Sequence, residues 1–232
     1  MPLFAVEDLA VELRYRDGRQ LRAVDGVSFR IGEGEALALV GESGSGKSLI
    51  AMGAVDLLPA GAEVVSGRTV FQGSVLQDLE EAHWRYLVGM GIGVLFQDAL
   101  GAWDPIEMIG PQSGEVLEAH GALGQDEVRE RVLQALGQVR LPRRLKYISY
   151  PHEMSRGQAQ RAMLAAALLS GPRMLIADEP LSGLDVTVAR AVLSLIDDLC
   201  RARGMGLLLV THDLAVVAAV ADRVAVVYGG MV

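Results

Sequence analysis

The chain has 232 residues, of which 51% are hydrophobic and 22% charged, with a net charge of −8 and a pI of about 5.0. This length and apolar content predict one large domain, or a domain with an inserted lobe, and exclude a disordered chain. The negative charge excludes a phosphate-backbone footprint, so no nucleic-acid partner is expected. The single cysteine, Cys200, excludes an internal disulfide and a cysteine-based zinc site, and favours a reducing compartment.

The first residues lack the basic stretch and long apolar core of a signal peptide. No apolar run approaches the ~18 residues that a membrane-spanning helix needs. The sequence therefore predicts a soluble protein.

Two segments near the N-terminus alternate between apolar and polar residues, at positions 9–13 and 27–31. Asp17-Gly18 is a turn signal between them. An antiparallel β-layer is therefore expected at the start of the chain.

A glycine-rich segment follows the apolar run Ala36–Val40 and precedes a predicted helix at Ser48–Leu58. Its spacing is that of a phosphate-binding loop, and it consists of Gly41, Glu42, Ser43, Gly44, Ser45, Gly46, Lys47 and Ser48. The glycines let the backbone turn tightly and aim N–H groups at one anion, and the helix start adds its positive end. Lys47 would reach the β- and γ-phosphates and Ser48 would ligate Mg²⁺. The alternative is a glycine-rich surface turn.

Further buried strands and helices alternate along the rest of the chain, which predicts an α/β fold with a parallel sheet. The predicted strands are Ile92–Phe96, Met174–Ala177, Leu207–Val210 and Val224–Val227, and the predicted helices are Gln158–Leu169, Val186–Ala202 and Leu214–Val220. Between Asp98 and Met154 the strand signal disappears, and helices are expected at Glu115–Glu118 and Asp126–Leu136. The simplest interpretation is an inserted, mostly helical lobe.

The strand predicted at Met174–Ala177 ends in Asp178-Glu179. Beside a phosphate loop, Asp178 would hold the Mg²⁺ shell and Glu179 would orient and polarise an attacking water. Taken alone, such acids are as often helix-capping or loop residues.

In these motifs the sequence resembles the ATP-binding cassette ATPases over essentially its whole length. The motifs stand in that family's order: Tyr15, the phosphate loop, Gln97, the signature segment Ser155–Gln158, Asp178-Glu179, the loop Ser182–Asp185, and Thr211–Asp213. The resemblance implies a P-loop NTPase (RecA-like) core with an N-terminal antiparallel β-subdomain and an inserted α-helical subdomain. It implies one nucleotide-binding domain over 1–232, with the core and β-subdomain at 1–97 and 171–232 and the helical subdomain at 98–170.

The resemblance also implies roles for single residues. Tyr15 would stack on adenine, Gln97 would ligate Mg²⁺ or the attacking water, and His212 would donate to the γ-phosphate. Ser155, Gly157 and Gln158 would cap a γ-phosphate held by a second ATPase subunit, with Asp185 at the dimer seam. From its own sequence context, Asp185 is a helix N-cap. Tyr15 could equally be an ordinary strand aromatic, Gln97 a polar strand end and His212 a structural histidine.

Two positions depart from the family pattern, which most often has Gly where this chain has Arg156 and commonly Ser-Ala at Ser182-Gly183. The segments Phe96–Asp98 and Tyr150–Glu153 resemble the oligopeptide, dipeptide and nickel importers. That implies an ATP- and Mg²⁺-dependent subunit, peripheral on the cytoplasmic face of the inner membrane. Its helical subdomain would bind membrane permeases, without direct contact with the transported solute.

Three alternatives stay open at this point. A non-transport ABC ATPase would need long inserts or basic tethers. A partly degenerate half-site in a heterodimer is suggested by Arg156. A small-molecule kinase would leave Ser155 and His212 unexplained.

Overall fold

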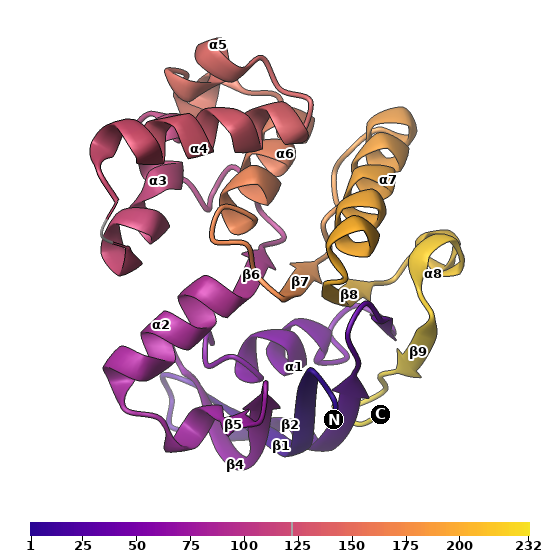
Figure 1. Ribbon diagram of the computed structural model, residues 1–232. Helices are drawn as coiled ribbons and strands as arrows, with labels where there is room; N and C mark the ends of the chain where they lie inside the picture. Colours follow the sequence, from indigo (N-terminus) through magenta and orange to yellow (C-terminus); the bar gives the residue numbers. More distant parts are fainter. Residues whose placement is uncertain (122) are drawn as a thin grey trace. The chain divides into compact units, whose positions relative to one another are not determined.

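The computed structural model describes residues 1–121 and 123–232; Ala122, inside the predicted helical subdomain, lies outside the described residues. The chain forms two compact units, coloured along the sequence in Figure 1. Unit 1 comprises Met1–Trp84 and Gly204–Val232, and unit 2 comprises Arg85–Arg203.

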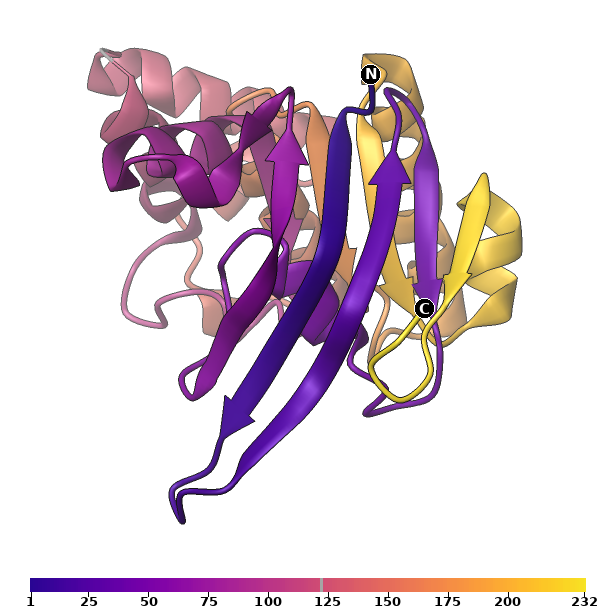
Figure 2. The same ribbon diagram turned by 90° about the horizontal axis from the view of Figure 1, so that it is seen from below.

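The first sheet of unit 1 is antiparallel, as the alternating pattern predicts. Its strands lie in the order β2-β1-β4-β5, with bounds of Gln20–Ile31 for β2, Phe4–Arg14 for β1, Ala62–Phe71 for β4 and Ser74–Val75 for β5. Figure 2 shows β1 and β2 as a long ribbon that ends in the turn at Asp17-Gly18. The short 3₁₀ helix η1, Leu76–Asp78, follows β5.

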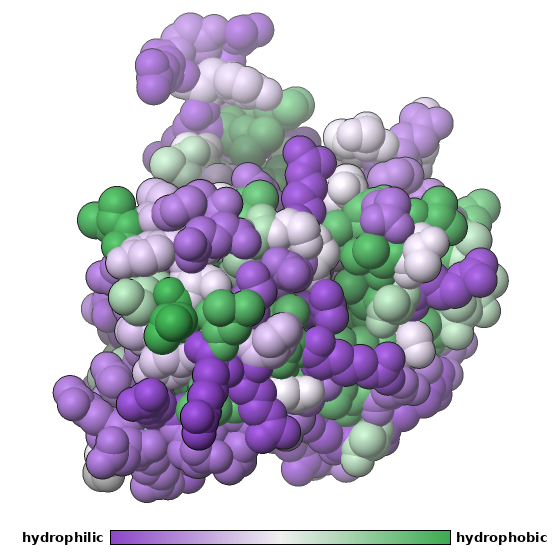
Figure 3. All heavy atoms as spheres, turned by 90° about the horizontal axis from the view of Figure 1, so that it is seen from above, coloured by the Kyte–Doolittle hydropathy of each residue, from purple (hydrophilic) through white to green (hydrophobic). Residues whose placement is uncertain are grey.

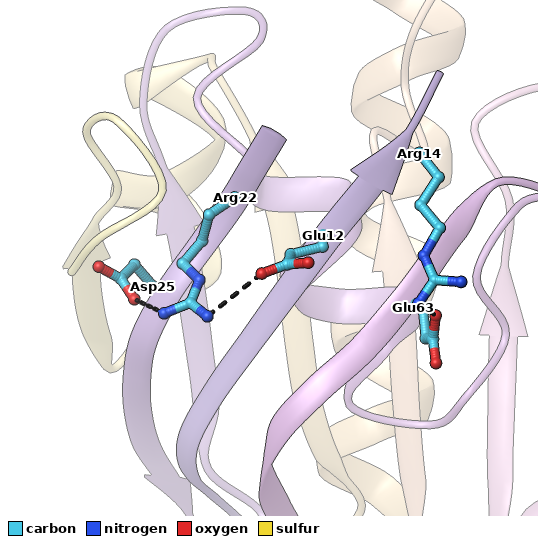
Figure 4. Close-up of polar contacts among 5 residues, drawn as sticks. All are labelled: Glu12, Arg14, Arg22, Asp25 and Glu63. Carbon is cyan, nitrogen blue, oxygen red and sulfur yellow. Dashed lines mark hydrogen bonds and ion pairs between the residues drawn. The ribbon is translucent and has the colours of Figure 1, made fainter. Parts of the chain in front are cut away.

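Ion pairs cross the strands of this sheet on an exposed face (Figure 4). The Arg22 guanidinium lies 3.2 Å from Glu12 on β1 and 3.3 Å from Asp25, and Arg14 on β1 lies 2.5 Å from Glu63 on β4. Hydrogen bonds from the guanidinium to Glu12 and Asp25 raise the pKa of Arg22. Water screens such exposed pairs, so each of them adds little stability.

The second group of strands in unit 1 is parallel. β3 (Ala36–Val40) lies between β8 (Gly206–Thr211) and β9 (Arg223–Val226), and every residue of β3 and β8 is buried. Such uninterrupted apolar runs are typical of strands that are covered on both faces. Helix α8 spans Leu214–Val220, as predicted.

Helix α1, Lys47–Gly53, ends earlier than the predicted Leu58. The chain turns after it, with Asp56 in the left-handed region at φ 56° and the Leu57 amide donating to the Met52 carbonyl. A left-handed residue cannot continue a right-handed helix.

Unit 2 combines a parallel strand pair with helices. β6 (Ile92–Leu95) pairs with β7 (Met174–Asp178). The helices are α3 (Ile109–His120), α4 (Gln125–Gln138), α5 (Arg143–Tyr147), the 3₁₀ helix η2 (Pro151–Glu153), α6 (Arg156–Ala167) and α7 (Val186–Arg203). Helix α2, Glu81–Gly91, leads into β6. Among the described residues between Asp98 and Met154 there is no strand, as predicted.

Cys200 lies on α7 with 4% of its surface exposed, and burial, followed by the nearby Asp197 charge, raises the pKa of its thiol to about 12. Because the thiolate is the reactive form, we expect Cys200 to be inert at neutral pH in the folded protein. A thiol-reactive dye should label one site per chain in denaturant and almost none without it. Rapid labelling of the native protein would contradict this placement.

In the part of the chain that the structure describes, no helix combines the length and the apolar character needed to cross a bilayer. On the face drawn in Figure 3, hydrophilic side chains separate the apolar ones into several groups.

Candidate functional site

The phosphate loop lies in the strand–loop–helix context that its motif requires. β3 ends at Val40, α1 begins at Lys47, and Gly46 at the helix start has φ 104°. Gly44 also has a positive φ, of 81°. These angles are costly for residues with a Cβ, so the loop path depends on glycine at both positions.

The Lys47 side chain hydrogen-bonds to the first residues of its own loop. The residue is 6% exposed, and its ammonium donates to the carbonyl oxygens of Gly41, at 2.9 Å, and Glu42, at 2.8 Å. The two carbonyl oxygens that hold this buried ammonium are neutral, and an anion in the loop would supply a counter-charge.

The buried Ser45 hydroxyl is a second sign that the loop accepts a ligand. Among the residues that the structure describes, it has no hydrogen-bond partner. Buried polar groups are nearly always paired, so this atom fits a site that a polar ligand completes. The exposed side chains of Glu42 and Ser43 and the half-buried Ser48 complete the loop.

His212 leaves the sheet at the same edge as the phosphate loop. β3 and β8 are parallel and in register, with Val40 opposite Thr211, so Gly41 and His212 follow neighbouring strand ends. The next residue, Asp213, caps α8 through a 2.8 Å hydrogen bond from the Ala215 amide. The structure therefore brings the loop and His212 to one edge of unit 1.

Tyr15 lies at the turn of the β1–β2 ribbon. The residue is 46% exposed, and the Arg19 guanidinium lies 5.5 Å from the ring centroid. The ring thus has an accessible surface and a cationic neighbour, which is compatible with stacking on a base.

In unit 2, three predicted residues lie at the ends of two neighbouring strands. Leu95 on β6 pairs with Ala177 on β7, so Gln97 and the acids Asp178 and Glu179 lie at one edge of the pair. Asp178 is 6% exposed and Glu179 is half-buried. Gln97 and Asp178 carry oxygen donors of the hard kind that Mg²⁺ prefers.

Glu179 has a left-handed backbone, with φ 45°. Its carbonyl oxygen accepts the Ser182 amide at 3.0 Å, which starts the turn toward α7. Non-glycine residues in this region are strained by about 1–3 kcal/mol, and such strain gathers at functional sites.

The signature segment forms the capped start of α6. The Ser155 hydroxyl accepts the Gln158 amide at 3.3 Å, and the Gln158 side chain accepts the Ser155 amide at 3.2 Å. Gly157 is required by packing, because a Cβ there would lie 2.5 Å from Val188 on α7. The Ser155 and Gln158 side chains thus form a capping box. The exposed Ser155 lies at the N-terminus of α6, the positive end of the helix dipole.

Two arginines flank this helix start. The Arg156 guanidinium packs over Gly183, where a Cβ would lie 2.8 Å from Nη1. Arg161 donates to the carbonyl oxygens of Gly157 and Arg140, both at 3.2 Å, and burial together with the Arg140 charge lowers the pKa of Arg161. The two unusual residues of the sequence, Arg156 and Gly183, are therefore in contact.

Asp185 is the N-cap of α7. Its carboxylate accepts the amides of Thr187, at 3.1 Å, and Val188, at 3.0 Å. The interpretation of Asp185 as a helix cap is confirmed.

One structural element next to the phosphate loop was not predicted. In the turn Tyr228–Met231, the Gly230 amide donates a 2.9 Å hydrogen bond to the Ser45 carbonyl oxygen. The Gly229-Gly230 dipeptide signals a turn, but nothing in the sequence indicates what the turn contacts.

The chain matches known proteins over almost its whole length. The profile of the ABC transporter family matches residues 24–182. The chain is 44% identical to the peptidoglycan transport ATP-binding protein YejF of Agrobacterium fabrum, covering 100% of this chain and 42% of the relative. It is 42% identical to the probable peptide ABC transporter ATP-binding protein y4tR of Sinorhizobium fredii, covering 99% of this chain and 69% of the relative. It is 39% identical to the oligopeptide transport ATP-binding protein OppD of Bacillus subtilis, covering 99% of this chain and 64% of the relative.

Solved structures give the same result for the fold. The dimeric ATP-binding cassette MJ0796, in a post-hydrolysis state bound to ADP and Pi, matches with a TM-score of 0.87 and 25% identity, covering 99% of this chain and 96% of that one. The protein cbiO1 of Clostridium perfringens, part of the transporter complex cbiONQ, matches with a TM-score of 0.80 and 27% identity. The match covers 99% of this chain and 86% of that one. The predicted fold class is confirmed.

The chain spans from 42% to 69% of the length of the three curated relatives named above. The family profile nevertheless covers well over half of this chain, and y4tR is matched over more than two thirds of its length. The chain therefore belongs to the ABC transporter family of ATP-binding cassettes.

Proposed function

We propose that this chain binds ATP and Mg²⁺ and hydrolyses ATP to drive an importer of peptides or related solutes. The observation that carries the proposal is the phosphate loop closed around a buried Lys47 ammonium. That arrangement offers a positive charge and backbone amides to one anion, as nucleotide phosphates require.

Each predicted residue has a role in this proposal. Tyr15 stacks on the adenine, the loop from Gly41 to Ser48 holds the phosphates, and the oxygens of Ser48, Gln97 and Asp178 would hold Mg²⁺. When bound, Mg²⁺ neutralises charge on the β- and γ-phosphates. Glu179 orients the attacking water and accepts its proton as the bond to the γ-phosphorus forms. The bond to the bridging oxygen breaks, ADP and phosphate leave, and His212 donates a hydrogen bond to the γ-phosphate.

The signature segment serves the nucleotide of a second subunit. Two ATPase chains, identical or similar, enclose two ATP molecules, with Ser155, Gly157 and Gln158 of one chain on the γ-phosphate of the other and Asp185 at the seam. The dimeric state of the MJ0796 cassette supports this arrangement. ATP would favour the closed pair and hydrolysis would open it.

We propose 1–97 and 171–232 as the catalytic core with its β-subdomain, and 98–170 as the helical subdomain that binds membrane permeases. The protein would then be peripheral on the cytoplasmic face of the plasma membrane, without nucleic acid and without direct contact with the solute. The names of the relatives favour peptide-type solutes over nickel. Neighbouring coding regions that specify two permeases and a solute-binding protein would support the importer.

The decisive experiment measures phosphate release from ATP by the purified chain with Mg²⁺ and with excess EDTA. We expect turnover that needs Mg²⁺, together with saturable ATP binding. A folded protein that neither binds nor hydrolyses ATP would refute the proposal.

Arg156→Gly tests whether the unusual signature residue weakens the site that this chain lends to its partner. We expect turnover to change by less than about tenfold, because the Ser155–Gln158 capping box does not use the Arg156 side chain. The measurement is steady-state ATP hydrolysis for both proteins. A larger change in either direction would show that the guanidinium contacts phosphate, and a large gain would favour a partly degenerate half-site.

A further inference from the structure

The residues after β9 form a tight two-glycine turn. Tyr228 and Met231 exchange backbone hydrogen bonds of 2.9 and 3.1 Å. Gly229 and Gly230 between them both have positive φ, of 55° and 79°. Two successive positive φ angles are the geometry of a type I′ turn, which favours glycine.

This turn packs directly on the backbone of the phosphate loop, and Figure 2 shows it beside the loop after β3. The Gly230 amide donates to the Ser45 carbonyl at 2.9 Å, and the Val227 amide donates to the Val40 carbonyl at 2.7 Å. At Gly41 a Cβ would lie 2.2 Å from the Val227 carbonyl oxygen. Val227, immediately before the turn, therefore contacts the beginning of the loop, and Gly230 within the turn contacts its middle.

Gly230 also binds β2 on its other side. The Asp25 amide donates to the Gly230 carbonyl at 2.9 Å, and a Cβ at Gly230 would lie 2.4 Å from the Ala23 carbonyl oxygen. Asp25 itself forms a 3.3 Å ion pair with Arg22 (Figure 4). Gly230 thus fills a gap between the phosphate loop and β2 that has no room for a side chain.

The contact determines which way one loop peptide faces. In a planar trans peptide the carbonyl and the N–H point in opposite directions. Because the Ser45 carbonyl points to Gly230, the Gly46 amide of the same peptide points to the opposite side of the loop. Loop amides must face one anion together to bind it.

We propose that Gly230 is a positioning residue of the phosphate loop, which holds the Ser45–Gly46 peptide in the orientation that presents the Gly46 amide to a nucleotide phosphate. This role rests on the proposed function.

The test compares Gly230→Ala with Gly229→Ala. Both substitutions place Ala at a positive φ, but a Cβ at Gly229 meets nothing within 4 Å, whereas at Gly230 it meets the Ala23 carbonyl. Gly229→Ala is therefore a matched control for backbone strain. ATP affinity is measured by calorimetry below the thermal transition of every variant. We expect Gly230→Ala to raise the Kd for ATP at least about tenfold and Gly229→Ala to change it by less than about threefold.

Equal affinity for ATP in Gly230→Ala and wild type would overturn the role of Gly230 alone, as would equal losses in both variants. A wild-type protein that binds no ATP would overturn the proposed function together with this role. If Gly230→Ala does not fold, amide hydrogen exchange on the wild type decides. We expect exchange at Gly230 and Gly46 to slow together by about tenfold or more when ATP binds. Unchanged exchange at Gly230 would overturn the proposal.

Discussion

Replacing Glu179 with glutamine is expected to lower ATP turnover by about 10²–10⁴-fold while ATP binding is retained. Glutamine has the shape of glutamate but cannot accept a proton from the attacking water. Because bound ATP would no longer be consumed, the closed pair of chains should accumulate. Phosphate release and ATP-dependent elution on a sizing column measure the two effects.

Glu127→Gln is the matched control for this variant. It also removes one carboxylate from unit 2, where Glu127 forms an exposed pair with Arg131 at 2.8 Å, one helical turn away on α4. Such pairs contribute only about 0.3–0.5 kcal/mol, so turnover should stay at the wild-type value. A Glu179→Gln protein that remains monomeric with ATP and still hydrolyses it would contradict the assigned role.

Replacing Lys47 with alanine is expected to weaken ATP binding by about 10²-fold or more. The ammonium holds the loop closed through Gly41 and Glu42 and would also reach the phosphates. Its loss removes both charge-assisted hydrogen bonds and the positive charge. Calorimetric titration with ATP, after circular dichroism has shown that the variant is folded, measures the effect.

Lys47→Arg separates charge from shape. Arginine keeps the positive charge, but its planar fork is larger than an ammonium and does not fit between the two carbonyls. We therefore expect this variant to lose most of the affinity as well. Wild-type affinity in Lys47→Arg would show that charge alone matters, and wild-type affinity in Lys47→Ala would contradict the role of the loop.

The sequence predicts the elements whose local pattern is strong. The uninterrupted apolar runs that became β3 and β8 and the helix Leu214–Val220 lie where they are expected. Strand β4 was not predicted, because its pairing with β1 is interrupted by a bulge and its apolar residues do not alternate regularly. At the bulge, Gly67 has φ 94°, and a Cβ there would lie 2.5 Å from the backbone of Asp8 and Leu9. Helices α2 and α5 were also missed, since α5 is only five residues long and α2 has a single buried residue, Val88.

In the candidate site, too, local features can be predicted from the sequence and contacts between distant segments cannot. The phosphate loop can be predicted because its spacing, glycines and flanking elements are local in the chain. Asp185 as a helix cap is local for the same reason. The contact of Gly230 with Ser45 cannot be predicted, because it joins distant segments and depends on the register of β9 beside β3. Likewise, the packing of Arg156 over Gly183 requires the three-dimensional path of the loop before α7.

The most direct test of the shared nucleotide site is one distance in a structure of Glu179→Gln with ATP and Mg²⁺. It joins the Ser155 hydroxyl oxygen of one chain to the nearest γ-phosphate oxygen bound by the Lys47 of another. We predict a hydrogen-bonding distance of about 3 Å. A Ser155 hydroxyl remote from every γ-phosphate in the crystal would contradict the ATP-driven pairing of two chains and leave only nucleotide binding.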